Sequence, residues 1–356
     1  MKKVYSPTKI FHHPEKVLSL SYDVKEKRAP LHVRIKPTNV CDQHCYFCAY
    51  ADNELQLGDR MVVKEKIEKD KMMELIDDLE SMGVKSITFS GGGEPLVYPY
   101  IEETLERIVE SGKLKFAFIT NGVGLKGRVL ELVAGHASWV RISVDGWDAK
   151  SYSDYRKVPL DRWQRLNDNI KNLIGMRNKC LLGIYQIIDS NNANRIYDII
   201  KYYHALGVDS IKLYGVVLYD DAQLNSQYHM QHEDTVRSQV AKAKRDFESN
   251  DFQINNGFSA KINDYSKEYS WCPSLQITPV IGADLKVYSC HDKAYTTEGE
   301  MGDLKEQSFR TFWSSSFDSF YKINPSSDCN HHCMVNVQNN LLLDYLNLYK
   351  DHIDFV

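Results

Sequence analysis

A short segment near the start of the chain has the spacing C-x3-C-x2-C and contains Cys41, Cys45 and Cys48. A strand-like run, 31–36, precedes it, and 37–39 supplies a turn. Thiolates crowded on one loop can hold a metal ion or an iron–sulfur cluster, and three is one fewer than the usual four. A cluster held this way leaves one iron open to another molecule. The alternative is a structural zinc site with His44 or a distant residue as the fourth ligand, although zinc ligands usually come as two separated pairs.

The remaining cysteines fall into one late group and one isolated residue. The late group consists of Cys272, Cys290, Cys329 and Cys333. Four thiolates suffice for one fully ligated 4Fe–4S cluster. A zinc site of four cysteines, or one that uses His331 or His332, is the alternative. The isolated Cys180 begins a predicted strand, where most lone cysteines are buried small hydrophobic side chains.

Composition excludes several classes of protein. The 356 residues are 43% hydrophobic, which allows a large core, and the formal net charge is −4. No block of lysines and arginines stands out, so we expect no nucleic-acid partner. The N-terminus lacks the apolar stretch of a signal peptide, and no apolar run approaches the roughly 20 residues that span a bilayer. We therefore expect a cytoplasmic protein with no membrane partner, in which thiols stay reduced.

Strand-like and helix-like patterns alternate from about residue 30 to 250. Amphipathic helical patterns occur near 67–82, 101–108, 126–134, 162–174 and 196–206, and strand-like runs occur at 31–36, 86–90, 114–119, 139–144, 180–188 and 210–217. About six such units predict parallel strands joined by right-handed crossovers. We therefore predict an α/β fold with a partial (β/α)6 TIM-type barrel, although an open sheet is not excluded.

The pattern changes after about residue 250. Runs at 276–281 and 285–290 indicate a β-hairpin, 309–313 and 318–323 indicate short helical pieces, and a last helix is predicted near 339–349. We predict an irregular lead-in over 1–30, the barrel over 31–250, and a small C-terminal α+β domain, hairpin plus helix, over 251–356. Chemistry on such barrels collects at the carboxyl ends of the strands, where the cysteine segment lies.

The early cysteines carry a resemblance to a known family. Their spacing, with Phe47 before the last one and the run Gly92-Gly93-Glu94-Pro95 after the next predicted strand, resembles the radical S-adenosylmethionine (SAM) superfamily over about residues 30–220. The resemblance implies a 4Fe–4S cluster on Cys41, Cys45 and Cys48, with SAM bound to the open iron. It also implies reductive cleavage of SAM to a 5′-deoxyadenosyl radical, which abstracts hydrogen from a substrate.

The same resemblance assigns cofactor contacts. Phe47 is expected near the adenine, and the glycine run is expected to approach the methionine moiety closely, with Glu94 or the local backbone meeting its ammonium group. Expected contacts at later strand ends are Asn121, Ser143 and Asp145, with Arg156 following at a spacing where related enzymes carry a functional arginine. The alternatives are plain turns at the glycine run and at Asp145, a core aromatic side chain for Phe47 and a solvated side chain for Arg156.

The late cysteines resemble the shortened auxiliary-cluster domain of these enzymes, the twitch form of the SPASM domain. The spacing Cys329-x3-Cys333 departs from the commoner C-x2-C. The resemblance implies one auxiliary 4Fe–4S cluster and a flavodoxin or ferredoxin as reductant. It also offers a catalytic alternative for Cys180, a thiol that donates a hydrogen atom to a substrate radical, as in radical epimerases.

The substrate is the least specified part of this interpretation. We expect oxidation or epimerisation of a carbohydrate-like small molecule that enters between SAM and the auxiliary cluster. Maturation of a peptide or protein side chain is the alternative; about 30 residues precede the first predicted strand, whereas many peptide-modifying relatives carry an N-terminal leader-binding domain. The polar segment 219–221 follows the last predicted barrel strand and could contact substrate. An iron–sulfur electron-transfer or scaffold protein is the alternative of another class, and it predicts no cleavage of SAM.

Overall fold

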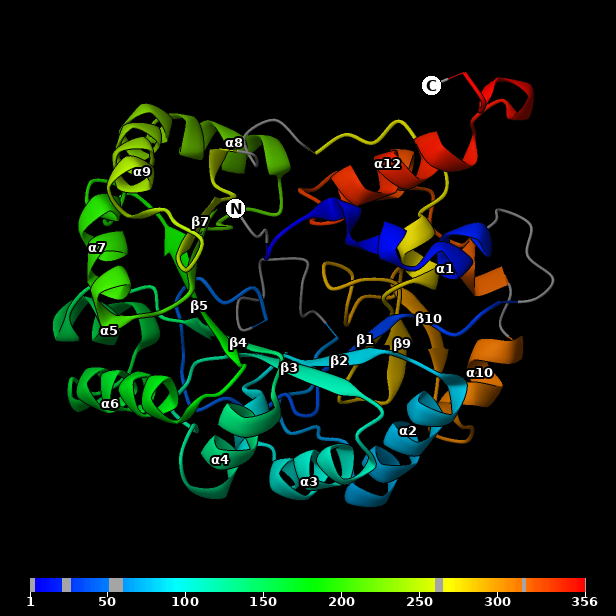
Figure 1. Cartoon of the computed structure of the whole chain (residues 1–356), viewed down its shortest axis with the longest axis horizontal. Coiled ribbons are helices and arrows are strands. Elements are labelled where there is room, and N and C mark those ends of the chain that lie inside the picture. The colour runs from blue at the N-terminus through cyan, green and yellow to red at the C-terminus, as the bar shows by residue number, and fades with distance from the viewer. Residues whose placement is uncertain (1–3, 21–26, 51–59, 260–264, 316–317, 356) are drawn as a thin grey trace.

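The computed structural model describes residues 4–20, 27–50, 60–259, 265–315 and 318–355 (Figure 1). Within these ranges the strands form one sheet in the order β10-β9-β8-β1-β2-β3-β4-β5-β6-β7. Its parallel part consists of β1 (His32–Ile35), β2 (Ser86–Phe89), β3 (Lys115–Thr120), β4 (Trp139–Ser143), β5 (Leu181–Ile188), β6 (Ser210–Gly215) and β7 (Gln253–Asn256). This arrangement confirms the predicted α/β partial barrel, and β7 extends it by one strand that the sequence pattern did not reveal.

Helices cover the outer face of the sheet (Figure 1). They are α2 (Lys69–Met82), α3 (Ile101–Ser111), α4 (Gly127–His136), α6 (Asp161–Met176), α7 (Ile196–Leu206) and α9 (Glu233–Phe247), with α5 (Ala149–Arg156) and α8 (Ala222–Met230) as additional helices after β4 and β6. In α2 the buried side chains Met72, Leu75, Ile76 and Leu79 recur at helical spacing, and the helix ends at Gly83, whose φ is 82°. Within the described ranges, no helix is long and apolar enough to cross a membrane.

The C-terminal region contains the predicted hairpin. It consists of η4 (Pro273–Gln276), β8 (Val280–Ile281), β9 (Lys286–Tyr288), β10 (Glu300–Asp303), α10 (Phe309–Ser315), η5 (Asp318–Phe320), α11 (Pro325–Asp328), α12 (Asn336–Leu346) and η6 (Lys350–His352). Strands β8 and β9 are antiparallel, as expected. Strand β8 also pairs in parallel with β1, where Arg34 faces Val280. The hairpin therefore continues the barrel sheet, and the division of the chain at residue 250 stays a prediction.

The described part of the lead-in is helical rather than irregular. It contains η1 (Pro7–His12) and α1 (Pro14–Leu18), each of which begins at a proline. Ile10 and Val17 pack with Trp271, Ile277 and Leu342 of the C-terminal region. The prediction of an irregular segment was wrong here because these helices are too short to show periodicity, and tertiary packing stabilises them.

Candidate active site

The three-cysteine loop, residues 41–48, begins after β1 and carries three half-buried thiols. The backbone N–H of Cys48 donates to the carbonyl of Cys45 at 3.1 Å, which folds the loop into a turn. Burial raises the pKa of the Cys41 thiol to about 12 and also raises the pKa of Cys45. Both are therefore neutral thiols at neutral pH in the absence of metal, and they would release protons on binding one. Three soft sulfur donors on one short loop fit an iron–sulfur cluster.

The glycine run after β2 lies against the entry to this loop. The N–H of Gly93 donates to Thr38 O at 3.2 Å, and the N–H of Glu94 donates to Val40 O at 2.8 Å. A Cβ atom on Gly93 would lie 2.1 Å from Val40 O, and one on Gly92 would lie 2.5 Å from Asn39 Oδ1. Glycine is thus required here for close packing between two loops of the protein. The expected approach of these glycines to the methionine moiety of SAM stays a prediction.

Glu94 joins the ends of two strands. Its carboxylate accepts hydrogen bonds from Leu96 N at 2.9 Å, Thr120 Oγ1 at 2.5 Å and Asn121 N at 2.7 Å, and Pro95 then begins η2 (Pro95–Val97). Burial raises the pKa of Glu94 to about 7, although these donors favour the charged form. The Glu94 side chain therefore holds the glycine run against the end of β3, and its predicted contact with the methionine ammonium, by the side chain or by the local backbone, stays a prediction.

Asn121, at the end of β3, contacts the three-cysteine loop directly. Its Nδ2 donates to Asp42 Oδ1 at 2.6 Å, and its Oδ1 accepts the N–H of Val123 at 3.0 Å. Ser143, at the end of β4, is half-buried, and the part of the chain that the structure describes shows no hydrogen bond to its hydroxyl. Its predicted role toward SAM remains a prediction.

Arg156, at the end of α5, is the main cationic contact of the loop. Its Nη1 donates to Gln43 Oε1 at 3.3 Å and to Cys45 Sγ at 3.4 Å, and its carbonyl accepts the N–H of His44 at 3.1 Å. Its Nη2 forms an ion pair with Asp145, which has a φ of 67°. The side chain is only 7% exposed. The alternative of a solvated arginine is therefore wrong, and Asp145 faces Arg156 inside the protein.

Phe47 lies in an aromatic group that the sequence did not reveal. Its ring centroid is 5.2 Å from Tyr46, 6.2 Å from Tyr155 and 5.8 Å from the Arg156 guanidinium. The hydroxyls of Tyr46 and Tyr155 both donate to Asp189, the Tyr155 bond being 2.5 Å long. Asp189 follows β5 directly, and this strand-end position was the one available indication of its role.

The late cysteines come together from separate segments. All four line a cavity of about 20 Å³, which we call the four-cysteine cavity. Asn339 Nδ2 lies 3.1 Å from Cys272 Sγ, and burial raises the pKa of the Cys272 thiol to about 11 and that of Cys333 to about 12. Across the described ranges, no group of three or more Cys, His, Asp or Glu side chains is placed to hold a single metal ion. The zinc site and the auxiliary cluster on these residues both stay predictions.

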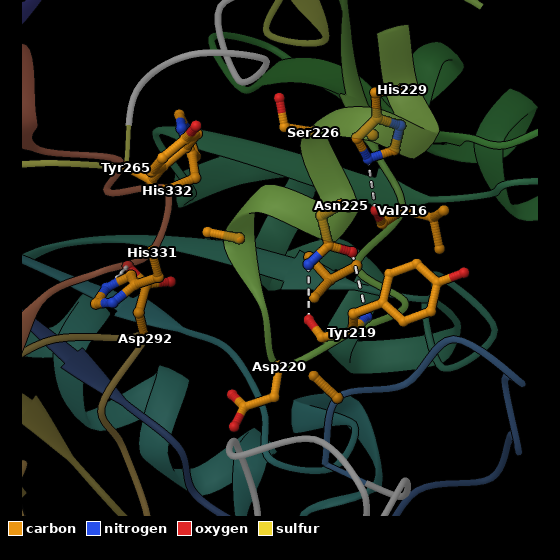
Figure 2. A pocket seen from close by; sticks show the side chains of 14 residues that line it. Val216, Tyr219, Asp220, Asn225, Ser226, His229, Tyr265, Asp292, His331 and His332 are labelled. Carbon is orange, nitrogen blue, oxygen red and sulfur yellow. Dashed lines mark hydrogen bonds and ion pairs between the residues drawn. The ribbon is translucent and has the colours of Figure 1, made fainter. Parts of the chain in front are cut away.

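A second cavity, of about 140 Å³, lies between the loop after β6, helix α8 and the C-terminal region (Figure 2). We call it the β6–α8 cavity. Its lining includes Tyr219 and Asp220 from the loop after β6 and Asp292 and His331 from the C-terminal region. Ala49, next to Cys48, lines it too, and His331 also lines the four-cysteine cavity. This space therefore adjoins both cysteine sites and can hold a small molecule.

Internal hydrogen bonds fix one wall of this cavity. Asn225 on α8 accepts the N–H of Leu218 at 2.9 Å and donates to Tyr219 O at 2.6 Å, as Figure 2 shows in part. His229 Nε2 bonds the carbonyl of Val216 at 2.8 Å. Tyr219 and Asp220 line the cavity, whereas Asp221 caps α8 by accepting the N–H groups of Gln223 and Leu224. The predicted contact of segment 219–221 with substrate stays a prediction.

Cys180 lies away from all of these groups. It immediately precedes β5, at the amino end of the strand, and is 3% exposed within the main hydrophobic core. Burial raises the pKa of its thiol to about 12. The catalytic assignment needed a thiol at the carboxyl ends of the strands, so we correct it to the other interpretation, a buried small hydrophobic side chain.

Comparisons with known proteins agree with this geometry. A family model described as the radical SAM superfamily matches residues 35–223. The GTP 3′,8-cyclase of Chlorobaculum tepidum is 27% identical over 295 residues, which cover 77% of this chain and 84% of that protein. SuiB of Streptococcus suis bound to SAM superposes with a TM-score of 0.62 at 16% identity, covering 87% of this chain and 74% of SuiB, and a SuiB structure bound to precursor peptide SuiA gives the same score. The enzyme anSMEcpe with bound SAM gives 0.56 at 14% identity, covering 89% and 96%.

Proposed function

The chain belongs to the radical SAM superfamily, and we propose that it binds a 4Fe–4S cluster through Cys41, Cys45 and Cys48. When bound, this cluster and SAM supply a 5′-deoxyadenosyl radical that abstracts hydrogen from substrate. The protein itself positions the loop and keeps water away. Arg156 orients Cys45 by its N–H donation, while Asp42 and Gln43 are held by Asn121 and Tyr152. SAM contacts from Phe47, Gly92, Gly93, Ser143 and Asp145 belong to the same proposal.

The substrate we propose is a carbohydrate-like small molecule bound in the β6–α8 cavity. The observation that carries this proposal is the pair of carboxylates, Asp220 and Asp292, in the lining of this cavity of about 140 Å³. Carboxylates accept hydrogen bonds from hydroxyl groups, which a carbohydrate-like molecule carries at most of its carbons.

The auxiliary site follows from the four-cysteine cavity. We propose that Cys272, Cys290, Cys329 and Cys333 hold a second 4Fe–4S cluster, which supplies an electron acceptor when the substrate is oxidised. Asn339 orients Cys272 at this site. His331 lines both this cavity and the β6–α8 cavity, which supports a short path between substrate and cluster.

Peptide maturation is the second candidate function. The likeness to SuiB, whose structure with its precursor peptide covers 94% of this chain, favours it. At 17% identity that likeness concerns the fold, so it does not outweigh the two carboxylates that line the cavity. A single experiment can separate the two candidates.

The test is anaerobic reconstitution followed by dithionite reduction with SAM. We expect about eight irons per chain and formation of 5′-deoxyadenosine. Ring-deuterated hexoses and cyclitols, with and without phosphate or carboxylate groups, should stimulate this formation and transfer deuterium to it, whereas cysteine-containing peptides should not. Absence of 5′-deoxyadenosine from fully loaded protein would overturn the radical chemistry, and stimulation by peptides alone would overturn the carbohydrate-like substrate.

A matched pair of variants tests the cavity. Asp220→Asn should raise KM for the stimulating substrate, while Asp251→Asn, an exposed carboxylate after α9, should not change it. Equal KM values for both variants would exclude the β6–α8 cavity as the binding site.

A further inference from the structure

The four-cysteine cavity is lined by cations and hydrogen-bond donors in addition to its thiols. Lys267 and Lys293 both line it, and they are only 6% and 5% exposed. Ser289 and Asn339 lie in the same lining, and among the described residues no Asp or Glu side chain lines this cavity. Lysine is seldom buried to this degree unless something compensates its charge. The lining therefore favours a negatively charged occupant.

Lys293 is the cation that most clearly lacks a partner. Across the residues that the structure describes, its Nζ makes no hydrogen bond or ion pair. Burial raises the pKa of the Cys329 thiol, and the positive charges of Lys293 and then Lys267 oppose that rise. Lys293 is therefore close enough to the thiols to stabilise negative charge on them.

Lys267 places its ammonium group between the four-cysteine cavity and the β6–α8 cavity. Its Nζ donates to the carbonyl of Tyr265 at 2.8 Å and to the carbonyl of His331. Tyr265 lines the β6–α8 cavity, and His331 lines both cavities. The side chain is therefore held in position by two backbone groups.

Two neutral side chains add donors to the same lining. Ser289 precedes Cys290 and is 1% exposed, and its Oγ has no hydrogen-bond partner among the described residues. Asn339 Nδ2 lies 3.1 Å from Cys272 Sγ, while its Oδ1 accepts the hydroxyl of Ser274 at 2.6 Å. Burying a hydroxyl without an acceptor is unfavourable, so Ser289 indicates that an acceptor binds in this cavity.

Carboxylates act on these thiols from outside the lining. Besides burial, the charges of Asp328 and Asp292 raise the pKa of Cys329. Asp292 lines the β6–α8 cavity instead, where its Oδ2 lies 3.9 Å from His331 Nε2. Asp328 is exposed and accepts the N–H of Asn324 at 2.8 Å. The lysines line the four-cysteine cavity and these carboxylates do not, so the cations have the stronger effect inside it.

A reduced iron–sulfur cluster is an occupant that such a lining stabilises. A 4Fe–4S cluster on four thiolates is an anion, and reduction adds one more electron to it. Cations nearby and hydrogen bonds to the sulfurs stabilise the reduced form, which raises the reduction potential.

We propose that Lys293, Lys267 and Ser289 raise the reduction potential of the auxiliary cluster, so that it accepts an electron from the substrate. This inference rests on the proposed function, and it narrows the reaction to oxidation of an alcohol to a carbonyl compound. Asp292 and Lys293 are consecutive residues that line the substrate cavity and the four-cysteine cavity, which makes the path between them short.

The electrons and protons of this oxidation balance. The substrate carbon loses a hydrogen atom to the 5′-deoxyadenosyl radical. The remaining carbon radical then loses one electron to the auxiliary cluster and its hydroxyl proton to water, which leaves the carbonyl group. An external one-electron carrier, a flavodoxin or ferredoxin, takes that electron from the site before the next turnover.

The test is a potentiometric titration followed by electron paramagnetic resonance. Reconstituted Cys45→Ala protein is expected to keep only the auxiliary cluster, so its signal reports this site alone. In this background, Lys293→Met should lower the midpoint potential by about 60 mV, a tenfold change in the reduction equilibrium. The control Lys305→Met removes an exposed charge between β10 and α10 and should leave the midpoint unchanged.

Two further variants separate charge from folding. Lys293→Arg keeps the positive charge and should keep the midpoint potential. Ser289→Ala removes one oxygen atom and should lower the midpoint by about 20 mV, a twofold change. Equal midpoints for Lys293→Met and Lys305→Met would overturn the role of Lys293. If Lys293→Met binds no cluster, an unchanged midpoint in Ser289→Ala would overturn the proposal.

Iron content separates this inference from the proposed function. About four irons in the Cys45→Ala protein, with a midpoint that responds to neither Lys293→Met nor Ser289→Ala, would leave the auxiliary cluster in place and overturn only the role of its lining. Absence of iron from this protein would overturn both. The titration needs no SAM, so a failure of the radical chemistry would not affect its outcome.

Discussion

The three-cysteine loop and the four-cysteine cavity bring thiols together in different ways. The loop carries its cysteines on one segment, and side chains from several strand ends and from α5 hold that segment in place. The cavity draws its cysteines from separate segments of the C-terminal region, which line a space of about 20 Å³. The two arrangements suit the two clusters that we propose, a three-cysteine loop for the cluster that binds SAM and four convergent thiols for the auxiliary cluster.

Removal of an early thiol should have the largest effect. Cys45→Ala is expected to reduce iron from about eight to about four per chain and to reduce 5′-deoxyadenosine formation to background, because two thiolates cannot hold the open cluster. Cys180→Ala is the control and should retain all the iron. Eight irons in the Cys45→Ala protein would show that the loop holds no cluster.

Removal of a late thiol should affect the product more than SAM cleavage. Cys333→Ala is expected to lose up to about four irons and to abolish product formation, while 5′-deoxyadenosine formation falls much less than in Cys45→Ala. Iron analysis and product chromatography measure the two effects. If both variants lost 5′-deoxyadenosine equally, the proposed division of roles would be wrong.

Arg156 should dominate the stability of the loop. Arg156→Ala leaves Asp145 buried without its ion-pair partner, and we expect a loss of about 3–5 kcal/mol in the free energy of unfolding. Arg128→Ala removes an exposed arginine from α4 and should cost about 0.5 kcal/mol or less. Denaturant titration of both proteins measures the difference, and equal losses would contradict the assigned role.

The smallest expected effect is a difference in how the side chains that stabilise the two regions respond to pH. Burial raises the pKa of Glu94 from 4.5 to about 7, so the folded protein binds this proton more tightly than the unfolded chain. Stability is therefore expected to fall as pH rises from about 4.5 to 7, by up to about 3 kcal/mol. Glu94→Gln should remove this dependence. Asn339→Ala, in the C-terminal region, should cost roughly 1–3 kcal/mol at every pH because an amide does not titrate. If the free energy of unfolding of Glu94→Gln varied with pH as it does in the unmodified protein, the role of Glu94 would be contradicted.

Local patterns predicted the barrel well because hydrophobic residues recur at different spacings in strands and in helices. The alternation from β1 to β6 and the strand-end positions of Asn121, Ser143 and Asp145 follow from those spacings alone. The pairing of β8 with β1 could not be predicted, because it joins residues far apart in sequence through very short strands. Helices η1 and α1 were missed because they too are very short.

Side-chain partners were less predictable than positions. Gly93 was singled out as a SAM contact, and the contact that the structure shows is with the backbone at Val40. Arg156 and Asp145 were each expected near the cofactor, yet nothing in the sequence revealed their ion pair.

The pairing of β1 with β8 also bears on how the chain is made. A ribosome completes β1 and its neighbour β2 within the first 89 residues, but the partner on the other side of β1 is complete only at Ile281. Throughout that interval β1 presents an unpaired edge to other chains. Synthesis rates of about 5–20 residues per second leave this edge open for roughly 10–40 seconds. The strand that leads into the three-cysteine loop is thus made before the other described strands of its sheet, and it gains its second neighbour only after β2 to β7 are complete.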